Sequence, residues 1–210
     1  ISLLAFSFLI GCDGEKSNVA PSKDSPEEAA TEAKPPEAVS VNPNLKYEIK
    51  GDAVTITRCA KDASGELIIP AIIEGKTVTS IGFSAFFFCR RLTSVTIPDG
   101  VTSIGTQAFS GCTNLTGITI PDSVTSFGDG AFQGCSRLTS ITIPDSVKSI
   151  GGMAFMGCSS LSAVTFLGDA PKIGDNAFQL SSPTIYREAD AKGWGDTFAG
   201  RPVKLITEKP

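Results

Sequence analysis

Histidine is absent from this chain of 210 residues, which also contains a single tryptophan and two tyrosines. Without histidine the chain can form neither a Ser-His-Asp or Cys-His catalytic unit nor a metal site with an imidazole ligand. The phosphate-binding pattern Gly-x-x-x-x-Gly-Lys-Ser/Thr does not occur, and no internal apolar run approaches the ~20 residues of a membrane-spanning helix. We therefore expect no catalytic residue, no metal site and no cofactor.

The charges do not favour a nucleic-acid partner. The chain has 22 acidic and 18 basic residues, a net charge of −4, and residues 13–44 hold seven of the acidic and three of the basic ones. The remaining chain is therefore balanced, and Arg90-Arg91 is its only conspicuous basic pair. Nucleic-acid-binding proteins show clustered Lys and Arg, so we expect no nucleic acid among the partners.

The beginning of the chain has the features of an export signal. Residues 1–10 are apolar and are preceded by neither a Met nor a basic segment, so we expect residues 1–11 to be part of a signal peptide. Leu9-Ile10-Gly11-Cys12 resembles a bacterial lipoprotein box, which implies cleavage before Cys12 and lipid attachment to its sulfur. The alternative is an ordinary signal peptide with an unrelated cysteine.

Residues 12–44 are expected to form a tether after this signal. The stretch 13–44 contains five prolines, many Ala and Glu, and no aromatic residue. It cannot bury enough apolar surface to fold, so we predict a disordered, acidic tether. Together, the lipidated Cys12 and the tether predict an exported protein of the bacterial cell envelope, which contacts the membrane through its lipid alone and faces the periplasm or the cell surface.

A repeat of 23 residues dominates the rest of the sequence. The repeated features are an Ala-Phe pair, a Cys and a Leu. The Phe residues are Phe86, Phe109, Phe132, Phe155 and Phe178, the Cys residues are Cys89, Cys112, Cys135 and Cys158, and the Leu residues are Leu92, Leu115, Leu138 and Leu161. A fixed period of 20–29 residues with a Leu-x-x-Leu-x-Leu core is typical of a leucine-rich repeat solenoid. We predict repeats over residues 81–183, with the Phe and Leu columns in a shared core.

Each coil is expected to contain one short parallel strand and little helix. Apolar and β-branched residues alternate toward the end of 115–120, and Pro121 closes the stretch because proline has no N–H for the ladder. Gly105, Gly128, Gly151 and Gly174 recur at one corner, which indicates either positive φ or a close backbone approach. The Ala-Phe segment is expected to form one helical or 3₁₀ turn at most.

These motifs resemble the BspA-like leucine-rich repeat family. The matching segments are Leu-Thr-Ser-Val-Thr-Ile-Pro at 92–98, Val-Thr-Ser-Ile-Gly at 101–105 and Ala-Phe-x-x-Cys at 108–112. The resemblance covers about residues 45–206 and implies a right-handed solenoid from a family found on bacterial surfaces and linked to adhesion. It implies no activity, since the family has no shared catalytic residues.

The two ends depart from the repeat, as terminal coils must. Residues 45–80 are predicted to form an N-terminal cap, with a strand pair from 54–57 and 67–70, and an irregular first coil. Residues 184–210 are predicted to form a C-terminal cap with a short helix over 189–198. Within it, Trp194 is expected to pack over the last coil, and ligand stacking is the alternative.

The repeated cysteines are interpreted as core residues. An exported protein favours disulfides, but stacked side chains that point the same way have poor disulfide geometry. No Cys-x-x-Cys metal pattern is present. We therefore expect buried, reduced thiols in this column and at Cys59.

The candidate binding face consists of the residues that flank the central apolar position of each strand. They are Ser94, Thr96, Gly117, Thr119, Ser140, Thr142, Ala163 and Thr165. Their face would measure on the order of 400 Å², less than the ~800 Å² per partner of a standard stable interface. We therefore predict weak binding of a protein or glycan ligand by a monomeric solenoid.

Four hypotheses remain at this point. The first is a non-catalytic, lipid-anchored surface or envelope protein of adhesion type, and the second is a structural envelope spacer without a specific ligand. The regular threonines suggest ice binding as a third. An enzyme would need converging carboxylates, but Asp99, Asp122 and Asp145 follow the prolines once per coil, as structural turn formers do.

Overall fold

The computed structural model describes residues 42–208, so the predicted signal peptide, the lipidation site Cys12 and nearly all of the tether lie outside the described residues. The described chain is a β-solenoid of about six turns with almost no helix. Its short helical segment, η1 (Ile206–Glu208), is a 3₁₀ turn after the last strand. The prediction of a leucine-rich repeat solenoid with short parallel strands is confirmed.

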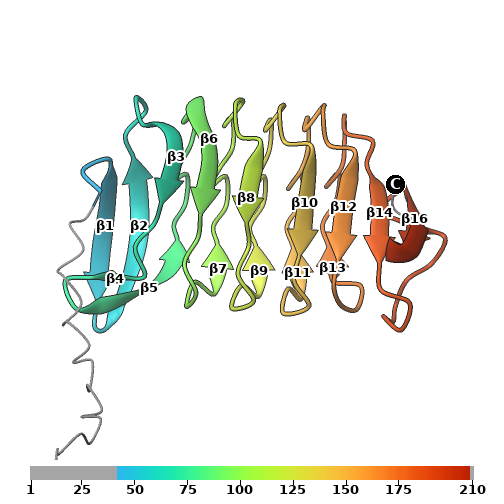
Figure 1. Ribbon diagram of the computed structural model, residues 1–210. Coiled ribbons are helices and arrows are strands. Elements are labelled where there is room, and N and C mark those ends of the chain that lie inside the picture. The colour runs from blue at the N-terminus through green and yellow to red at the C-terminus, as the bar shows by residue number, and fades with distance from the viewer. Residues whose placement is uncertain (1–41, 209–210) are drawn as a thin grey trace, which may run out of the picture. The chain divides into compact units, whose positions relative to one another are not determined.

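One sheet runs along the repeats from the N-terminal hairpin onward (Figure 1). Its path is β1 (Leu45–Lys50), β2 (Ala53–Cys59), β5 (Lys76–Ile81), β7 (Ser103–Ile104), β9 (Ser126–Phe127), β11 (Ser149–Ile150) and β13 (Lys172–Ile173). The β1–β2 pair is antiparallel, and the pairs from β2 to β13 are parallel. The short β4 (Ile72–Ile73) pairs with β5 in the antiparallel sense.

A second row of strands forms two separate sheets. The first comprises β3 (Ser64–Ile68), β6 (Arg91–Thr96) and β8 (Gly117–Thr119), and the second comprises β10 (Ser140–Ile143), β12 (Ala163–Phe166), β14 (Thr184–Arg187), β16 (Arg201–Leu205) and β15 (Thr197–Phe198). All pairs in this row are parallel except β15–β16. Each regular coil thus contributes a strand to both rows, so the expectation of one strand per coil missed the two-residue strands of the long sheet.

Two details of the predicted caps are wrong. The segment 189–198 forms turns and β15 rather than a helix. Residues 54–57 and 67–70 do not pair with each other, because 54–57 lies in β2 beside β1, whereas β3 contains residues 67–68 and pairs with β6.

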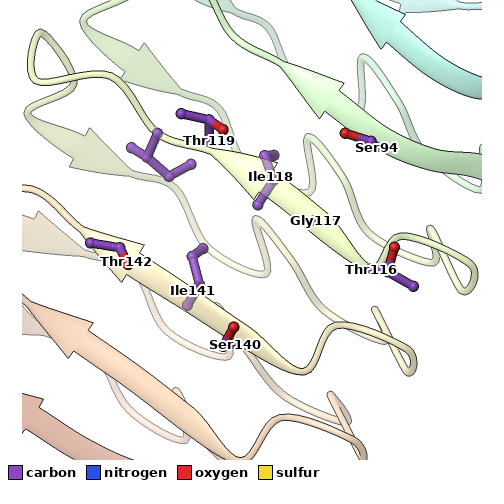
Figure 2. A pocket seen from close by; sticks show the side chains of 9 residues that line it. Ser94, Thr116, Gly117, Ile118, Thr119, Ser140, Ile141 and Thr142 are labelled. Atoms are coloured by element: carbon purple, nitrogen blue, oxygen red, sulfur yellow. The ribbon is translucent and has the colours of Figure 1, made fainter.

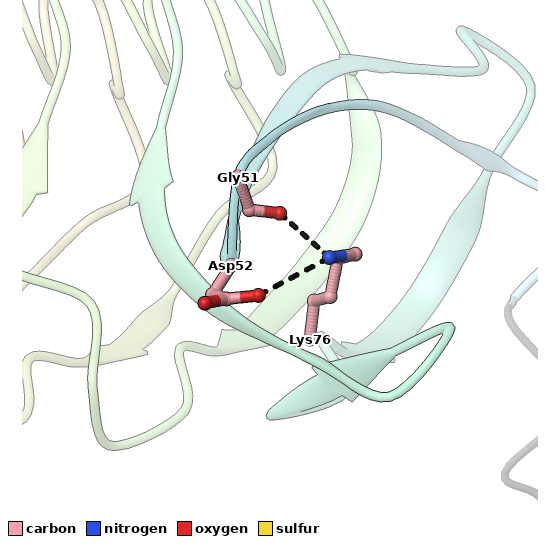
Figure 3. A network of polar contacts seen from close by, with 3 residues as sticks. All are labelled: Gly51, Asp52 and Lys76. Atoms are coloured by element: carbon pink, nitrogen blue, oxygen red, sulfur yellow. Dashed lines mark hydrogen bonds and ion pairs between the residues drawn. The ribbon is translucent and has the colours of Figure 1, made fainter.

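The turn between β1 and β2 is held to β5 by polar contacts of Lys76. Lys76 Nζ donates to Gly51 O at 2.7 Å and forms an exposed ion pair with Asp52 at 3.3 Å (Figure 3).

The C-terminal cap closes the solenoid with aromatic rings. Trp194 lies 5.0 Å from Phe166 and 4.8 Å from Phe198, measured between ring centroids. Its indole N–H donates to Gly168 O at 3.2 Å, which satisfies the polar edge of the half-buried ring. The prediction that Trp194 packs over the last coil is confirmed.

The core is a continuous stack of repeated side chains. Successive rings of the Phe column have centroids 4.7, 5.5, 5.4 and 5.4 Å apart and lie within 14° of parallel. These rings and the Leu column belong to one buried cluster, with each member at most 2% exposed. Because consecutive strands are in register, equivalent residues repeat at nearly the strand spacing of ~4.8 Å. The shared interior that the repeat predicted is therefore present.

The corner glycines are explained by close approach between coils. A Cβ added to Gly128 would lie 2.4 Å from Thr106 N, and the equivalent glycines are similarly crowded by the preceding coil. Positive φ occurs instead at a neighbouring column that contains Gly111, Gly134 and Gly157. Phe88 and Leu180 occupy this column in the first and last repeats and share the left-handed conformation, with φ of 56° and 58°.

The repeated cysteines form no disulfide with one another. Cys59, Cys89, Cys112, Cys135 and Cys158 are buried and free, which confirms that prediction. The thiols of Cys112, Cys135 and Cys158 donate to the carbonyl of the Phe 26 residues earlier, at 3.1–3.2 Å. Ser181 makes the same bond to Phe155 O at 2.7 Å in the last coil. The column is thus a set of buried donors that links successive turns, and burial raises the pKa of Cys112 and Cys158 to about 12.

Candidate functional site

The predicted binding residues lie on the face of the second row of strands. Parallel register stacks Ser94 beside Gly117 and Thr96 beside Thr119, and a second pair of strands stacks Ser140 beside Ala163. The four residues Thr96, Thr119, Ser140 and Thr142 are exposed, whereas Ser94, Gly117 and Ala163 are half-buried. These seven positions share the outward-facing side of β6, β8, β10 and β12.

Thr165 does not belong to this exposed face. It is only 6% exposed, although the repeat predicted that it would point to solvent. In register beside it, β14 carries Tyr186, which is itself buried, where the earlier coils have threonine. A tyrosine covers more of its neighbour in a ladder than a threonine does, so the change of residue type closes the column at its C-terminal end. The candidate face therefore ends at Thr142 and Ala163.

The strand ladder is interrupted in the middle of the face. Thr116 N–H donates to Thr93 O and Ser162 N–H donates to Thr139 O, both at 2.9 Å. Their hydroxyls repeat these bonds at 3.1 Å. Within residues 42–208 no equivalent bond joins Thr139 to Thr116, and β8 and β10 end separate sheets. The facing edges of these two strands therefore lack the pairing that links every other neighbouring pair in the row.

A pocket of about 430 Å³ occupies this interruption. Its wall is formed by hydroxyl-bearing and small residues of β6, β8 and β10 and by Thr116 just before β8 (Figure 2). The residues of these strands are Ser94, Gly117, Thr119, Ser140 and Thr142. Ile118, Ile120 and Ile141 supply apolar surface. Ile118 is half-buried, whereas Val95 and Ile141, which occupy the same column, are 1% and 3% exposed. The interruption thus makes Ile118, a member of the core column, partly accessible from the candidate binding face.

The pocket offers hydrogen bonds but no charge. Hydroxyl groups can both donate and accept, and none of the lining residues is ionisable at neutral pH. Such a surface can bind an uncharged polar ligand through short-range contacts, with little dependence on salt. In the described part of the chain, no group of three or more His, Cys, Asp or Glu side chains could hold a metal ion.

Five of the eight predicted binding residues therefore line one pocket, which are Ser94, Gly117, Thr119, Ser140 and Thr142. The sequence did not predict the pocket itself. Its one signal was Gly117, the only glycine in a column that otherwise contains Ser and Ala. A glycine inside a strand weakens it and often marks a site that a ligand or another backbone approaches.

The comparisons with known proteins agree with this architecture. A family model described as the BspA type leucine-rich repeat region matches residues 66–184 in six copies. The chain belongs to this BspA-type repeat family. Proteins with these repeats are in general bacterial surface or exported proteins, and the family and its fold are generally non-catalytic.

Among the solved structures that are similar to the chain, two are 29–30% identical to it. A leucine-rich repeat protein of T. pallidum is 30% identical with a TM-score of 0.63, and the match covers 70% of this chain and 71% of that one. A leucine-rich repeat protein from Bacteroides capillosus is 29% identical with a TM-score of 0.52, and the match covers 62% of this chain and 99% of that one. A search of curated proteins found no match.

No helix among residues 42–208 is long and apolar enough to cross a membrane.

Proposed function

We propose that this protein is a lipid-anchored, non-catalytic protein of the bacterial envelope or surface, whose solenoid binds a protein or glycan weakly in the manner of an adhesin. The observation that carries the proposal is the uncharged, hydroxyl-bearing strand face with its pocket between β8 and β10. Membership of the BspA-type repeat family supports export to the envelope. The lipoprotein-box pattern that ends at Cys12 supports the anchor.

The geometry supports weak binding at a single site. The exposed face extends from β6 to β12 and is smaller than predicted, because Thr165 is covered. A stable protein interface buries ~800 Å² on each partner, about twice what such a face offers. Many copies held on one membrane would strengthen attachment through effective concentration rather than through new contacts. The proposed protein therefore acts as one of many parallel weak contacts.

Lysine substitutions on the two strand rows test the binding face. In Thr119→Lys/Thr142→Lys, long charged side chains replace two exposed hydroxyls of the candidate face. The matched control Thr102→Lys/Thr125→Lys alters two exposed threonines beside the long sheet, where Lys148 already occupies the equivalent place in the next coil. Both variants shift the net charge equally. We expect capture of envelope or host components by the immobilised full chain to fall at least tenfold in the first variant only.

Equal capture by both variants would overturn the binding face and favour the structural-spacer hypothesis. The anchor is tested separately by metabolic labelling with a fatty-acid analogue in a bacterium that lipidates exported proteins. We expect label on the chain expressed behind a complete export signal and none on Cys12→Ala. Label that persists on Cys12→Ala, or its absence from both chains, would remove the anchor from the proposal without affecting the binding face.

A further inference from the structure

The structure points to a specific ligand class for the pocket at Gly117: we propose that it is a subsite for one uncharged sugar residue of a glycan. This inference rests on the proposed function and narrows it from a protein or glycan to a neutral glycan. It follows from the space above Gly117, the open edges of β8 and β10, the chemistry of the lining and the size of the pocket.

The protein itself gives no reason for a glycine at position 117. A Cβ added there would meet no atom within 4 Å, in contrast to the crowded corner at Gly128. Its φ is not in the left-handed region, so a side chain would cause no backbone strain there. A serine or alanine of the kind found at positions 94, 140 and 163 would fit but would fill the opening. The space above Gly117 is therefore free for a ligand.

The interruption beneath this space leaves backbone groups available to a ligand. No backbone bond joins Thr139 to Thr116, although the other neighbouring strands of this row are paired. Polar backbone groups that lack a protein partner are satisfied by water or by a ligand. A polyhydroxylated molecule can supply several donors and acceptors to such edges and to the Thr119 and Ser140 hydroxyls at once.

An inserted peptide strand does not fit this opening. Cα atoms of β8 and β10 approach within 8 Å of each other, whereas a strand inserted between them in the sheet would need about 9.6 Å, twice the usual strand spacing. Ile118 and Ile141, which belong to the inward-facing column of β8 and β10, line the pocket as well, so we place the ligand on the outer side of the two strands. These limits favour a compact ring over an extended chain.

The lining matches the two-sided character of a neutral sugar. A pyranose presents hydroxyls around its rim and C–H groups on its faces, and the pocket places hydroxyls around isoleucine side chains (Figure 2). No lysine, arginine or acidic residue lines it, so it offers no counter-charge to a sialylated or sulfated sugar. Its volume of about 430 Å³ lies within the ~300–1,000 Å³ range of small-ligand sites.

The test uses the full chain and soluble sugars, because weak binding is expected. The probes are cellotriose, mannotriose and triacetylchitotriose as neutral sugars, 3′-sialyllactose as an acidic sugar, and a neutral Gly-Ser decapeptide. Saturation-transfer NMR and titration measure binding to the parent chain and three variants. Gly117→Val fills the space above the pocket, and Thr119→Val removes one hydroxyl without changing the shape of the side chain. Thr125→Val, at an exposed threonine beside the long sheet, is the matched control.

We expect at least one neutral sugar to bind the parent chain and neither sialyllactose nor the peptide to compete with it. Gly117→Val should weaken that sugar at least tenfold, and Thr119→Val should weaken it about fivefold, as for the loss of one hydrogen bond. Thr125→Val should change its affinity less than twofold. Circular dichroism establishes that each variant is folded, and if Gly117→Val is not, Thr119→Val against Thr125→Val decides the question.

Three outcomes overturn the inference and are distinguishable from failure of the proposed function. Sugar affinity unchanged in a folded Gly117→Val, or in Thr119→Val, would place the sugar elsewhere. Preferred binding of sialyllactose or of the peptide would assign the pocket to another chemistry. If no neutral sugar binds but a captured protein is released by Thr119→Lys/Thr142→Lys, the sugar subsite fails while the binding face stands. If no neutral sugar binds and Thr119→Lys/Thr142→Lys has no effect on protein capture, both the sugar subsite and the binding face are rejected.

Discussion

Replacing Phe132 by alanine tests whether the repeated rings form one shared core. Phe132 is fully buried and contacts three other rings. Phe109 and Phe155 stack on its two faces, at 5.5 and 5.4 Å, and Phe127 meets its edge at 5.5 Å. Truncating a buried Phe destabilises a protein by ~3–5 kcal/mol. Since each aromatic pair contributes about 0.5–1.5 kcal/mol beyond burial, we expect Phe132→Ala to lie at the upper end, about 5 kcal/mol.

Phe178→Ala is the matched control, because it is the same substitution at the end of the stack. Phe178 is 2% exposed and has a single stacked partner in the column, Phe155 at 5.4 Å. It therefore lacks two of the ring contacts that surround Phe132. At about 1 kcal/mol per ring pair, Phe178→Ala should cost roughly 2 kcal/mol less than Phe132→Ala. The difference between the two variants is thus a direct measure of the stack.

Urea unfolding followed by circular dichroism measures both free energies. The dependence of the free energy of unfolding on urea concentration must be compared with that of the parent chain. A change in this slope would indicate that the solenoid has split into separately unfolding parts. A loss below about 1 kcal/mol for Phe132→Ala would refute the shared core. A larger loss for Phe178→Ala than for Phe132→Ala would refute the assignment of stability to stacking between coils.

Three further predictions concern glycine and cysteine columns. Gly128→Ala should destabilise the fold by at least about 1–3 kcal/mol through overpacking against Thr106, whereas Gly117→Ala should change the melting temperature little. An equal shift in melting temperature in both variants would contradict the close approach of coils at Gly128. Leu180→Gly should raise the free energy of unfolding by up to about 1 kcal/mol, because φ is positive there and the side chain is 77% exposed; a loss in urea unfolding would count against backbone strain. Burial raises the pKa of Cys112 to about 12, so its thiol contributes stability below pH 9 that is lost as the pH rises toward 12, at up to about 1.4 kcal/mol per pH unit. Between pH 8 and pH 11 the free energy of unfolding, measured in urea, should therefore fall less steeply with pH in Cys112→Ser than in the parent chain. An equal dependence on pH in the two proteins would argue against this linkage.

Much of the fold could be predicted from the sequence because stacking makes it nearly one-dimensional. Once Phe109 and Phe132 occupy equivalent places, the contacts of every other coil follow from the same register. The ends could not be predicted this way, since they are single, unrepeated segments. The strand β15 replaced an expected helix because residues 197–198 pair with β16, a long-range contact that local propensity does not reveal.

The candidate face shows the same division between repeated and unrepeated residues. Alternation along the strands placed Thr96, Thr119 and Thr142 outside, and all three are exposed. Thr165 follows the same pattern but is buried beside Tyr186, where the repeat ends. The cysteine column was predicted as core, but only the structure shows that its thiols, and Ser181 in the last coil, donate to the carbonyl of an earlier Phe.

By itself, the amino-acid sequence determined the period, the solenoid, the residues of its core and the outward direction of the hydroxyl-bearing column, because these follow from one pattern applied in every coil. Tertiary structure decided where that regularity stops. The lost pairing between β8 and β10 and the burial of Thr165 depend on how two neighbouring coils fit together. An unpaired strand edge or a covered side chain depends on two neighbouring coils, so the sequence of a single repeat cannot predict it.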